Sequence, residues 1–197
     1  MRETELKAVV PDESACVARM LSSGAQPVTE GRLEDRRYDY PDRRLTLRDI
    51  VLRLRVRRDA TGTEASIDWK GAASFEGGFK HREETSLTIG DPGQMAAILE
   101  ALGFVVTRAI DRHIRIFTLG DALLRVERYP RMDTLLEVEG PEPAIETAIR
   151  ASGLPRDSFV TDRLFQFVQR FEARTGQRAA ISDEELAGNY RYPLEDA

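Results

Sequence analysis

The stretch Glu3-Thr4-Glu5-Leu6-Lys7 opens the chain with a charged residue at every second position. Side chains alternate between the two faces of a strand, so the two glutamates and the lysine point the same way. Two carboxylates and an ammonium group on one face make a candidate cation site beside an anion contact. A second pair of carboxylates with the same spacing, Glu137-Val138-Glu139, lies far down the chain. Together the two pairs predict a barrel with a charged interior that holds a metal-bound polyphosphate.

Several stretches between these pairs repeat the same alternation. In residues 50–58, three apolar side chains on one face alternate with three arginines on the other. Residues 64–71 and 80–87 carry lysine, arginine and acidic side chains in the same manner. The other expected strands are residues 3–7, 26–40, 105–119, 122–129 and 134–140, and the expected helices are residues 11–24, 91–103, 142–151, 158–173 and a short one from Ser182. Short connections between several neighbouring strands favour antiparallel pairing.

The composition limits the class of protein. The 197 residues are 41% hydrophobic and 32% charged, which is typical of one soluble globular domain with a sizeable core. A formal net charge of -5 argues against nucleic acid as a partner, although arginine is concentrated on the central strands. No apolar run approaches membrane-spanning length, and the N-terminus lacks an apolar signal region. The single cysteine, Cys16, excludes an internal disulfide and indicates a buried structural thiol, so we expect a reducing, cytoplasmic location.

A strand with one charged face can be an ordinary sheet strand whose charged face meets water. Two observations favour a different arrangement here. The charged faces are rich in arginine and include both glutamate pairs, and the helices must pack their apolar stripes on the apolar strand faces. We therefore expect an α+β fold: a closed eight-stranded antiparallel β-barrel, or tunnel, with a polar, charged interior and helices packed outside. Residues 1–175 form the expected tunnel domain, and residues 176–197 form a C-terminal tail with a short helix.

The expected interior side chains suit a chain of phosphates. Guanidinium groups bind phosphate oxygens in a bidentate manner, and lysine adds a point charge. The expected cations are Lys7, Arg53, Arg55, Lys70, Arg82, Arg112 and Arg125. The glutamate pairs would repel a polyanion unless a hard divalent cation lay between them, and Mg²⁺ or Mn²⁺ binds carboxylate and phosphate oxygens together. The two histidines, His81 and His113, are isolated, so we expect packing or surface roles for them.

In these motifs the chain resembles the CYTH family, also called triphosphate tunnel metalloenzymes. The matching motifs are, in order, Glu3-x-Glu5-x-Lys7, Tyr38-Asp39-x-Pro41, Leu52-Arg53-Leu54-Arg55, Trp69-Lys70-Gly71, Arg82-x-Glu84, Leu102-Gly103-Phe104 and Leu136-Glu137-Val138-Glu139-Gly140. They cover residues 1 to about 170, and their order is more specific than any one of them. The resemblance implies an eight-stranded antiparallel tunnel, in agreement with the strand pattern.

The resemblance also implies roles for individual residues. It assigns metal binding to Glu3, Glu5, Glu137 and Glu139, triphosphate binding to Lys7, Arg53, Arg55, Lys70, Arg82 and Arg125, and interior acidic positions to Glu84 and Glu127. Three departures stand out: Ser86 replaces an expected acidic residue, Arg112 lies in a blurred Lys-x-Arg motif, and Arg37-Tyr38 replaces a tyrosine pair of similar thiamine triphosphatases. The last departure argues against thiamine triphosphate as the substrate.

The leading expectation is an enzyme that hydrolyses a triphosphate, inorganic or organic, with Mg²⁺ or Mn²⁺. Lys7 and Glu5 are the expected catalytic residues; Lys7 either lies nearest the reacting phosphorus or neutralises its neighbouring glutamates. Two other functions stay open: a class IV adenylate cyclase that converts ATP to cyclic AMP and pyrophosphate, and a polyphosphate-binding module without chemistry. The expected partner is a small-molecule triphosphate or nucleotide, with neither nucleic acid nor membrane, and a homodimer stays open.

Overall fold

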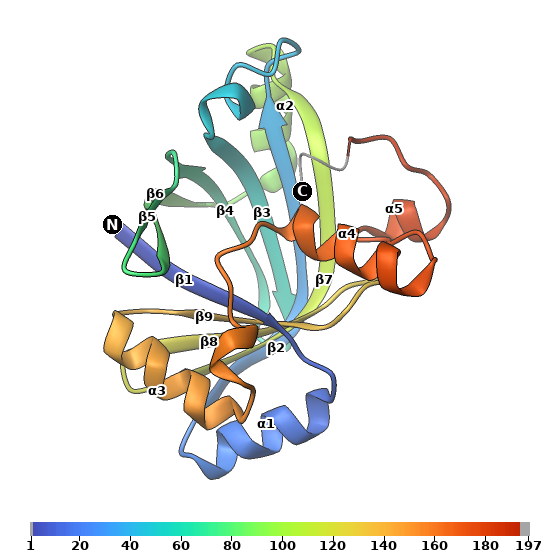
Figure 1. The fold of residues 1–197 in the computed structure, drawn as a ribbon. Helices are drawn as coiled ribbons and strands as arrows, with labels where there is room; N and C mark the ends of the chain where they lie inside the picture. Colours follow the sequence, from blue (N-terminus) through green and yellow to red (C-terminus); the bar gives the residue numbers. More distant parts are fainter. Residues whose placement is uncertain (1, 194–197) are drawn as a thin grey trace.

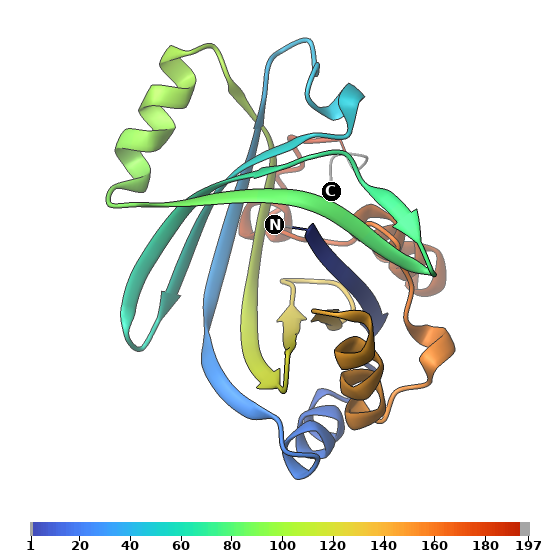
Figure 2. The same ribbon diagram turned by 90° about the vertical axis from the view of Figure 1, so that its left-hand side faces the viewer.

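The computed structural model describes residues 2–193, with side chains from residue 4 onward, and in this range nine strands form one antiparallel sheet (Figure 1). The strands are β1 (Arg2–Val9), β2 (Gln26–Asp39), β3 (Val51–Asp59), β4 (Gly62–Lys70), β5 (Ser74–Glu76), β6 (Phe79–Ile89), β7 (Val105–Leu119), β8 (Ala122–Arg128) and β9 (Leu135–Glu139). Their order is β1-β9-β8-β7-β2-β3-β4-β6-β5, and a further pairing of β1 with β6 closes eight of them into a barrel. Figure 2 shows the long β6 crossing from the side of β4 and α2 (Pro92–Ala101) towards β1. The closed barrel confirms the predicted fold.

The helices pack outside the barrel on the apolar faces of the strands. Besides α2, they are α1 (Glu13–Ser22), α3 (Glu142–Ser152), α4 (Leu164–Thr175) and α5 (Asp183–Leu186), with short 3-10 turns η1 (Thr46–Arg48) and η2 (Arg156–Ser158). α1 and α3 share a core with the strands, in which Met20 and Ile145 join Leu6 and Val138. Burial of these apolar side chains between strand and helix stabilises the barrel wall from outside. The charged faces of the same strands are thereby directed inward.

Local signals explain where the helices begin and end. The Asp12 side chain accepts a hydrogen bond of 2.9 Å from Ala15 N and so caps α1. Asp91 caps α2 in the same way, and the proline that follows it suits the first helical position. α3 ends at Gly153, whose φ of 71° lies in the left-handed region that favours glycine. These caps fix the helices that cover the barrel.

The predicted helix at residues 158–173 is wrong in its first part, because α4 begins only at Leu164. Val160 instead forms an antiparallel bridge with Lys7, with N–O distances of 2.9 and 2.8 Å between the two backbones. These hydrogen bonds use the backbone groups that a helix would need, and Phe159 is buried in the core beside them. No pattern predicts β5, which is only three residues long.

The C-terminal tail packs on an edge of β7. Asp111 N donates a hydrogen bond of 2.8 Å to Ile181 O, and Arg131 forms an antiparallel bridge with Ala180. The Ser182 hydroxyl caps α5, which confirms the predicted short helix. None of the helices within the described residues is long and apolar enough to cross a membrane.

Candidate active site in the barrel interior

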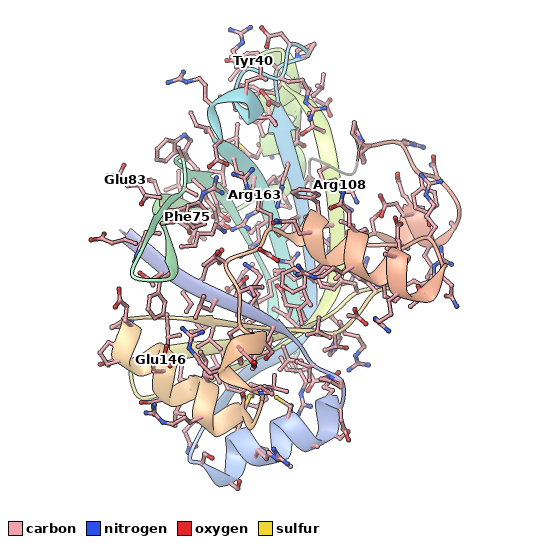
Figure 3. The ribbon with its side chains drawn as sticks, viewed as in Figure 1. Tyr40, Phe75, Glu83, Arg108, Glu146 and Arg163 are labelled. Carbon is pink, nitrogen blue, oxygen red and sulfur yellow. The ribbon has the colours of Figure 1, made fainter. Side chains whose placement is uncertain are left out.

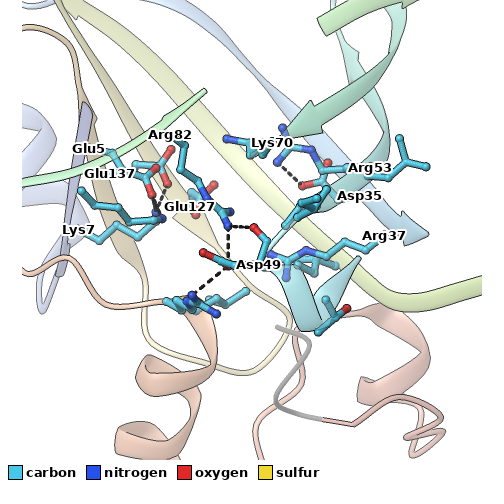
Figure 4. Close-up of a pocket in the computed structure, with 18 of the residues that line it drawn as sticks. Glu5, Lys7, Asp35, Arg37, Asp49, Arg53, Lys70, Arg82, Glu127 and Glu137 are labelled. Carbon is cyan, nitrogen blue, oxygen red and sulfur yellow. Dashed lines mark hydrogen bonds and ion pairs between the residues drawn. The ribbon is translucent and has the colours of Figure 1, made fainter. Parts of the chain in front are cut away.

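The barrel encloses a cavity of about 150 Å³ (Figure 4). Among the described residues, nine basic and five acidic side chains line it, an excess of four positive charges when all are ionised. The basic residues are Lys7, Arg37, Arg53, Lys70, Lys80, Arg82, Arg112, Arg125 and Arg163, and the acidic residues are Glu5, Asp35, Asp49, Glu127 and Glu137. Buried charges are stable only when they are paired with opposite charges. The charge balance of the interior therefore favours a polyanionic ligand.

The two carboxylate pairs predicted to bind metal meet where β1 lies beside β9. Glu5 is directly opposite Glu139, and Lys7 is directly opposite Glu137. Lys7 Nζ lies 2.6 Å from Glu137 Oε2 and 3.1 Å from Glu5 Oε1. The fourth predicted ligand, Glu3, belongs to the same strand, and its side chain lies outside the described residues. The two ends of the sequence motif thus come together on the inside of the barrel.

Besides Lys7, Glu5 and Glu137 each bind one more basic side chain. Lys80 on β6 binds Glu5, and Arg125 on β8 binds Glu137. Burial raises the pKa of Glu5, but Lys7 and Lys80 outweigh this effect and hold that pKa well below its usual range. Burial and the charge of Lys7 lower the pKa of the Lys80 ammonium to about 8, although Glu5 opposes them. Glu5 is therefore ionised at neutral pH, and the ammonium group of Lys80 loses its proton at a pH slightly above neutral.

From Arg125 the ion pairs continue across β8, β7 and β2. Glu127 accepts hydrogen bonds of 3.0 Å from Arg125 Nε and 2.8 Å from Arg112 Nε. Arg112 in turn donates a hydrogen bond of 3.0 Å to Asp35. The Tyr129 hydroxyl donates a further hydrogen bond of 2.6 Å to Glu127. Burial raises the pKa of Glu127, but Arg112 and Arg125 lower it by more, so this carboxylate stays ionised.

The contacts continue through β3 and β4 to β6. Arg55 donates to both oxygens of Asp35 over 2.8 and 2.9 Å, and Arg53 lies 3.6 Å from the same carboxylate. Arg53 also donates to Asp68 over 2.7 and 3.0 Å, and Ser86 on β6 donates to Asp68 over 2.6 Å. The contacting residues therefore come from all eight strands of the barrel. We call the following set the charge ring: Lys80, Glu5, Lys7, Glu137, Arg125, Glu127, Arg112, Asp35, Arg53, Asp68 and Ser86.

A separate group of charges lies at the more exposed end of the cavity. Asp49 follows η1, and its Oδ1 lies 2.7 Å from Arg82 Nη2 and 2.9 Å from Arg163 Nη2. The other oxygen of Asp49 accepts a hydrogen bond of 2.8 Å from Ala73 N. Figure 3 places Arg163 at the start of α4, beside the strands that line the cavity. We call Asp49, Arg82 and Arg163 the mouth cluster.

Most of the predicted site residues line the cavity: Glu5, Lys7, Arg53, Lys70, Arg82, Arg112, Arg125, Glu127 and Glu137. The other three with described side chains are not among the residues that line it. Arg55 is turned towards Asp35 and supports the wall. Glu84 binds Lys70 and lines a separate surface depression, and Glu139 is half-buried.

Five charged residues of the cavity have no counterpart among the predictions: Asp35, Arg37, Asp49, Lys80 and Arg163. Lys80 carries a usable signal, because it lies two residues before Arg82 and shares its face. Asp35 and Arg37 alternate within β2 in the same way. Burial and the nearby Arg53 lower the pKa of Arg37 to about 10, as expected where positive charge is in excess. Asp49 and Arg163 lie in connecting segments, where no periodicity predicts side-chain direction.

The carboxylates of β1 and β9 fit a hard divalent cation that also binds the substrate. Among the side chains that the structure describes, no group of three or more histidine, cysteine, aspartate or glutamate residues converges closely enough to hold a metal ion by itself. Mg²⁺ is commonly bound by one or two carboxylates together with substrate phosphates and waters. Glu5 and Glu137, which share Lys7, supply such a set of oxygen ligands.

Comparisons with known proteins agree with this geometry. PH1819 from Pyrococcus horikoshii OT3 has a similar fold, with a TM-score of 0.72, 19% identity, and coverage of 85% of this chain and 98% of that chain. A candidate adenylate cyclase from Vibrio parahaemolyticus has a TM-score of 0.71, 19% identity, and coverage of 85% and 97%. A candidate adenylyl cyclase from Hippeastrum, HpAC1, which shows a dominant triphosphatase activity, has a TM-score of 0.61, 20% identity, and coverage of 89% and 96%.

These structures show only that the fold is similar, because their sequence identities to this chain are low. The family assignment comes instead from the sequence. No curated protein matches the chain. The family model described as the CYTH domain matches residues 1–149, a range that includes all nine strands and the whole charge ring. Members of this family are metal-dependent tunnel enzymes that act on triphosphates. This chain belongs to the CYTH domain family.

Proposed function

We propose that this protein hydrolyses a triphosphate with the help of a divalent cation, and that inorganic tripolyphosphate is the first substrate to test. The observation that carries the proposal is the positive excess of the cavity beside the paired carboxylates of β1 and β9. A single phosphate would not balance this excess, whereas a triphosphate carries several negative charges along one chain. The activity of the family on triphosphates supports the same proposal.

The basic side chains would bind and orient the phosphates. Arg53, Lys70 and Arg82 come from β3, β4 and β6 and line the cavity together. Carboxylates already hold two of them in place, because Arg53 binds Asp68 and Lys70 binds Glu84. Donors that are fixed before the substrate arrives stabilise its charge without reorganisation during the reaction.

The acidic side chains would bind the cation and position water. Glu5 and Glu137, with Glu139 and Glu3, would hold Mg²⁺ or Mn²⁺, which when bound stabilises negative charge on the phosphoryl group as a Lewis acid. Lys7 lies between Glu5 and Glu137, so its ammonium group would be nearest to the reacting phosphorus. Glu5 would orient the attacking water by accepting its hydrogen bond. The low pKa of Glu5 makes it a weak proton acceptor, so its role is positioning rather than strong base catalysis.

A class IV adenylate cyclase is the second candidate, because the similar protein from Vibrio parahaemolyticus carries that description. The same cavity would bind ATP, and the ribose 3′-hydroxyl would attack the α-phosphate to give cyclic AMP and pyrophosphate. The cavity volume of about 150 Å³ lies below the range of about 300–1,000 Å³ that is usual for drug-sized ligands. This small volume favours a bare triphosphate over a nucleotide.

Phosphate release from tripolyphosphate with Mg²⁺ or Mn²⁺ tests the proposal. Glu137→Gln should lower turnover by about a hundredfold or more, because it removes a charge beside the reacting group. Glu146→Gln is the matched control, since Glu146 on α3 pairs with the half-exposed Arg156 of η2, and neither residue lines the cavity. This variant should keep the wild-type rate. Thermal unfolding of both variants confirms that they are folded.

A parallel assay with ATP separates the two candidates. Cyclic AMP formation without released monophosphate would favour the cyclase. Equal turnover in wild type and Glu137→Gln would remove the metal-binding role of Glu137. The absence of any product from either substrate, with either metal and with folded protein, would refute both enzymatic functions.

A further inference from the structure

The mouth cluster joins three separate parts of the chain. Asp49 follows η1, Arg82 lies on β6, and Arg163 precedes α4, beyond residues 1–149 that match the family domain. Arg82 is a predicted phosphate ligand, yet its NH2 group donates to the Asp49 carboxylate over 2.7 Å and to the Asp49 backbone oxygen over 2.8 Å. Figure 4 shows the labelled Asp49 and Arg82 joined in this way within the cavity. A carboxylate thus takes contacts that a phosphate oxygen could use.

We propose that Asp49 competes with the triphosphate for Arg82 and Arg163, and that this competition selects for polyphosphates long enough to reach the mouth cluster. The inference rests on the proposed function. Guanidinium groups bind carboxylate and phosphate oxygens in the same planar manner, and a phosphate carries more negative charge. A triphosphate that reaches both arginines displaces Asp49, and Arg163 becomes a substrate-binding residue. A shorter polyphosphate that is bound near Lys7 leaves the contact with Asp49 intact.

The exposure of the three side chains fits such an exchange. The Arg82 side chain is only 10% exposed and stays in the cavity wall, whereas Asp49 is 28% exposed and Arg163 is 49% exposed. A displaced Asp49 carboxylate is therefore next to water and is not left unpaired in a dry interior. Among the described residues, no group accepts a hydrogen bond from the buried Arg82 Nε. Arg82 therefore keeps a further donor for an incoming phosphate.

Asp49→Asn tests whether the charge of Asp49 competes with the substrate, while it preserves the structure of the loop. The φ of 54° at Asp49 lies in the left-handed region, which asparagine adopts readily. The asparagine carbonyl oxygen can also accept the hydrogen bond from Ala73 N. The substitution removes the negative charge while the loop keeps its anchor. Asp42→Asn is the matched control, because Asp42 lies in the same loop and pairs with the exposed Arg44.

Calorimetric binding of tripolyphosphate and of pyrophosphate, in EDTA so that turnover does not occur, tests the proposal. Asp49→Asn should bind tripolyphosphate about tenfold more tightly than wild type and should bind pyrophosphate within about twofold of wild type. Arg163→Gln should weaken tripolyphosphate binding by about threefold to tenfold and leave pyrophosphate binding unchanged. Asp42→Asn should match wild type with both anions.

Two results would overturn the inference alone. Equal tightening for both anions in Asp49→Asn would indicate a general charge effect without selection for length. Unchanged or weaker tripolyphosphate binding would show that Asp49 only holds Arg82 in place. In both cases, metal-dependent phosphate release by the wild type would leave the proposed function standing. If the wild type binds neither anion and releases no phosphate, the proposed function and this inference fail together.

Discussion

Replacing Arg112 by methionine should destabilise the protein strongly, because Arg112 is a buried link of the charge ring. Its side chain is 5% exposed and donates to Glu127 over 2.8 Å and to Asp35 over 3.0 Å. Methionine adapts to the space but carries no charge, so two buried carboxylates lose a partner. Removing one partner of a buried ion pair costs about 3–5 kcal/mol. Each carboxylate keeps other donors, so we expect a loss at the lower end, about 3 kcal/mol.

Unfolding in urea measures this loss, and a decrease in Tm of about 6–12 °C is the expected independent readout for a chain of this size. Arg58→Met is the matched control. Arg58 pairs with Glu34 at the surface, so its replacement should cost less than about 1 kcal/mol. Equal losses in the two variants would refute the reasoning that burial makes the Arg112 contacts strong.

The pH dependence of the loss supplies a second readout. Burial raises the pKa of Asp35 and of Glu127, but their arginine partners outweigh it and lower both pKa values in the folded protein. The stability contributed by such carboxylates is present above their unfolded pKa of about 4 and is lost as pH falls through the folded values. The difference between wild type and Arg112→Met should therefore shrink below about pH 4. A difference that does not change with pH would contradict the assignment to these carboxylates.

Lys80, Gly31 and Cys16 offer further tests. Because burial and a neighbouring ammonium group lower the pKa of Lys80 to about 8, its positive charge is lost as pH rises through that value. Metal-free tripolyphosphate affinity should therefore fall about fivefold between about pH 7 and pH 9 in wild type but not in Lys80→Arg, and equal profiles would contradict this role. In Gly31→Ala the added Cβ clashes with the Arg58 carbonyl oxygen, and urea unfolding should show a loss of about 1–3 kcal/mol. In Gly90→Ala a Cβ meets no described atom within 4 Å, so stability should change by less than about 1 kcal/mol. Cys16 is buried, and burial is the main cause that raises its pKa to about 11. A thiol reagent should therefore label it slowly in native protein and rapidly in urea. Equal labelling rates would show that the thiol is not buried.

The alternation of charged and apolar residues, together with helices that must pack on the apolar strand faces, predicted the barrel. A period of two assigns every side chain of a strand to one face, so the pattern of β3 alone separates its arginines from its apolar residues. The spacing of Glu5 with Lys7, and of Glu137 with Glu139, then placed four charged residues on the same inner surface. The register in which β1 meets β9 agrees with this placement.

The remaining parts of the site depend on interactions that no local pattern contains. The pairing of Arg112 with Asp35 depends on the register of β2 with β7, two strands that are far apart in sequence. Its pairing with Glu127 depends on the register of β7 with the next strand, β8. Asp49 and Arg163 lie in connecting segments, and they meet only because the barrel brings those segments together. The segment before α4 looked helical because its apolar spacing suits a helix, but the bridge between Val160 and Lys7 outweighs that preference.

The charge ring limits how the interior of this protein can change in evolution. Neighbouring members contact one another from Lys80 to Ser86, so the loss or reversal of one charge leaves the next buried charge with fewer opposite charges to compensate it. A change at Arg112 should therefore persist in a lineage only when a second change follows at Asp35 or Glu127. We expect related sequences to vary at these positions in correlated sets, while the outer surfaces of α1 and α3 diverge one residue at a time.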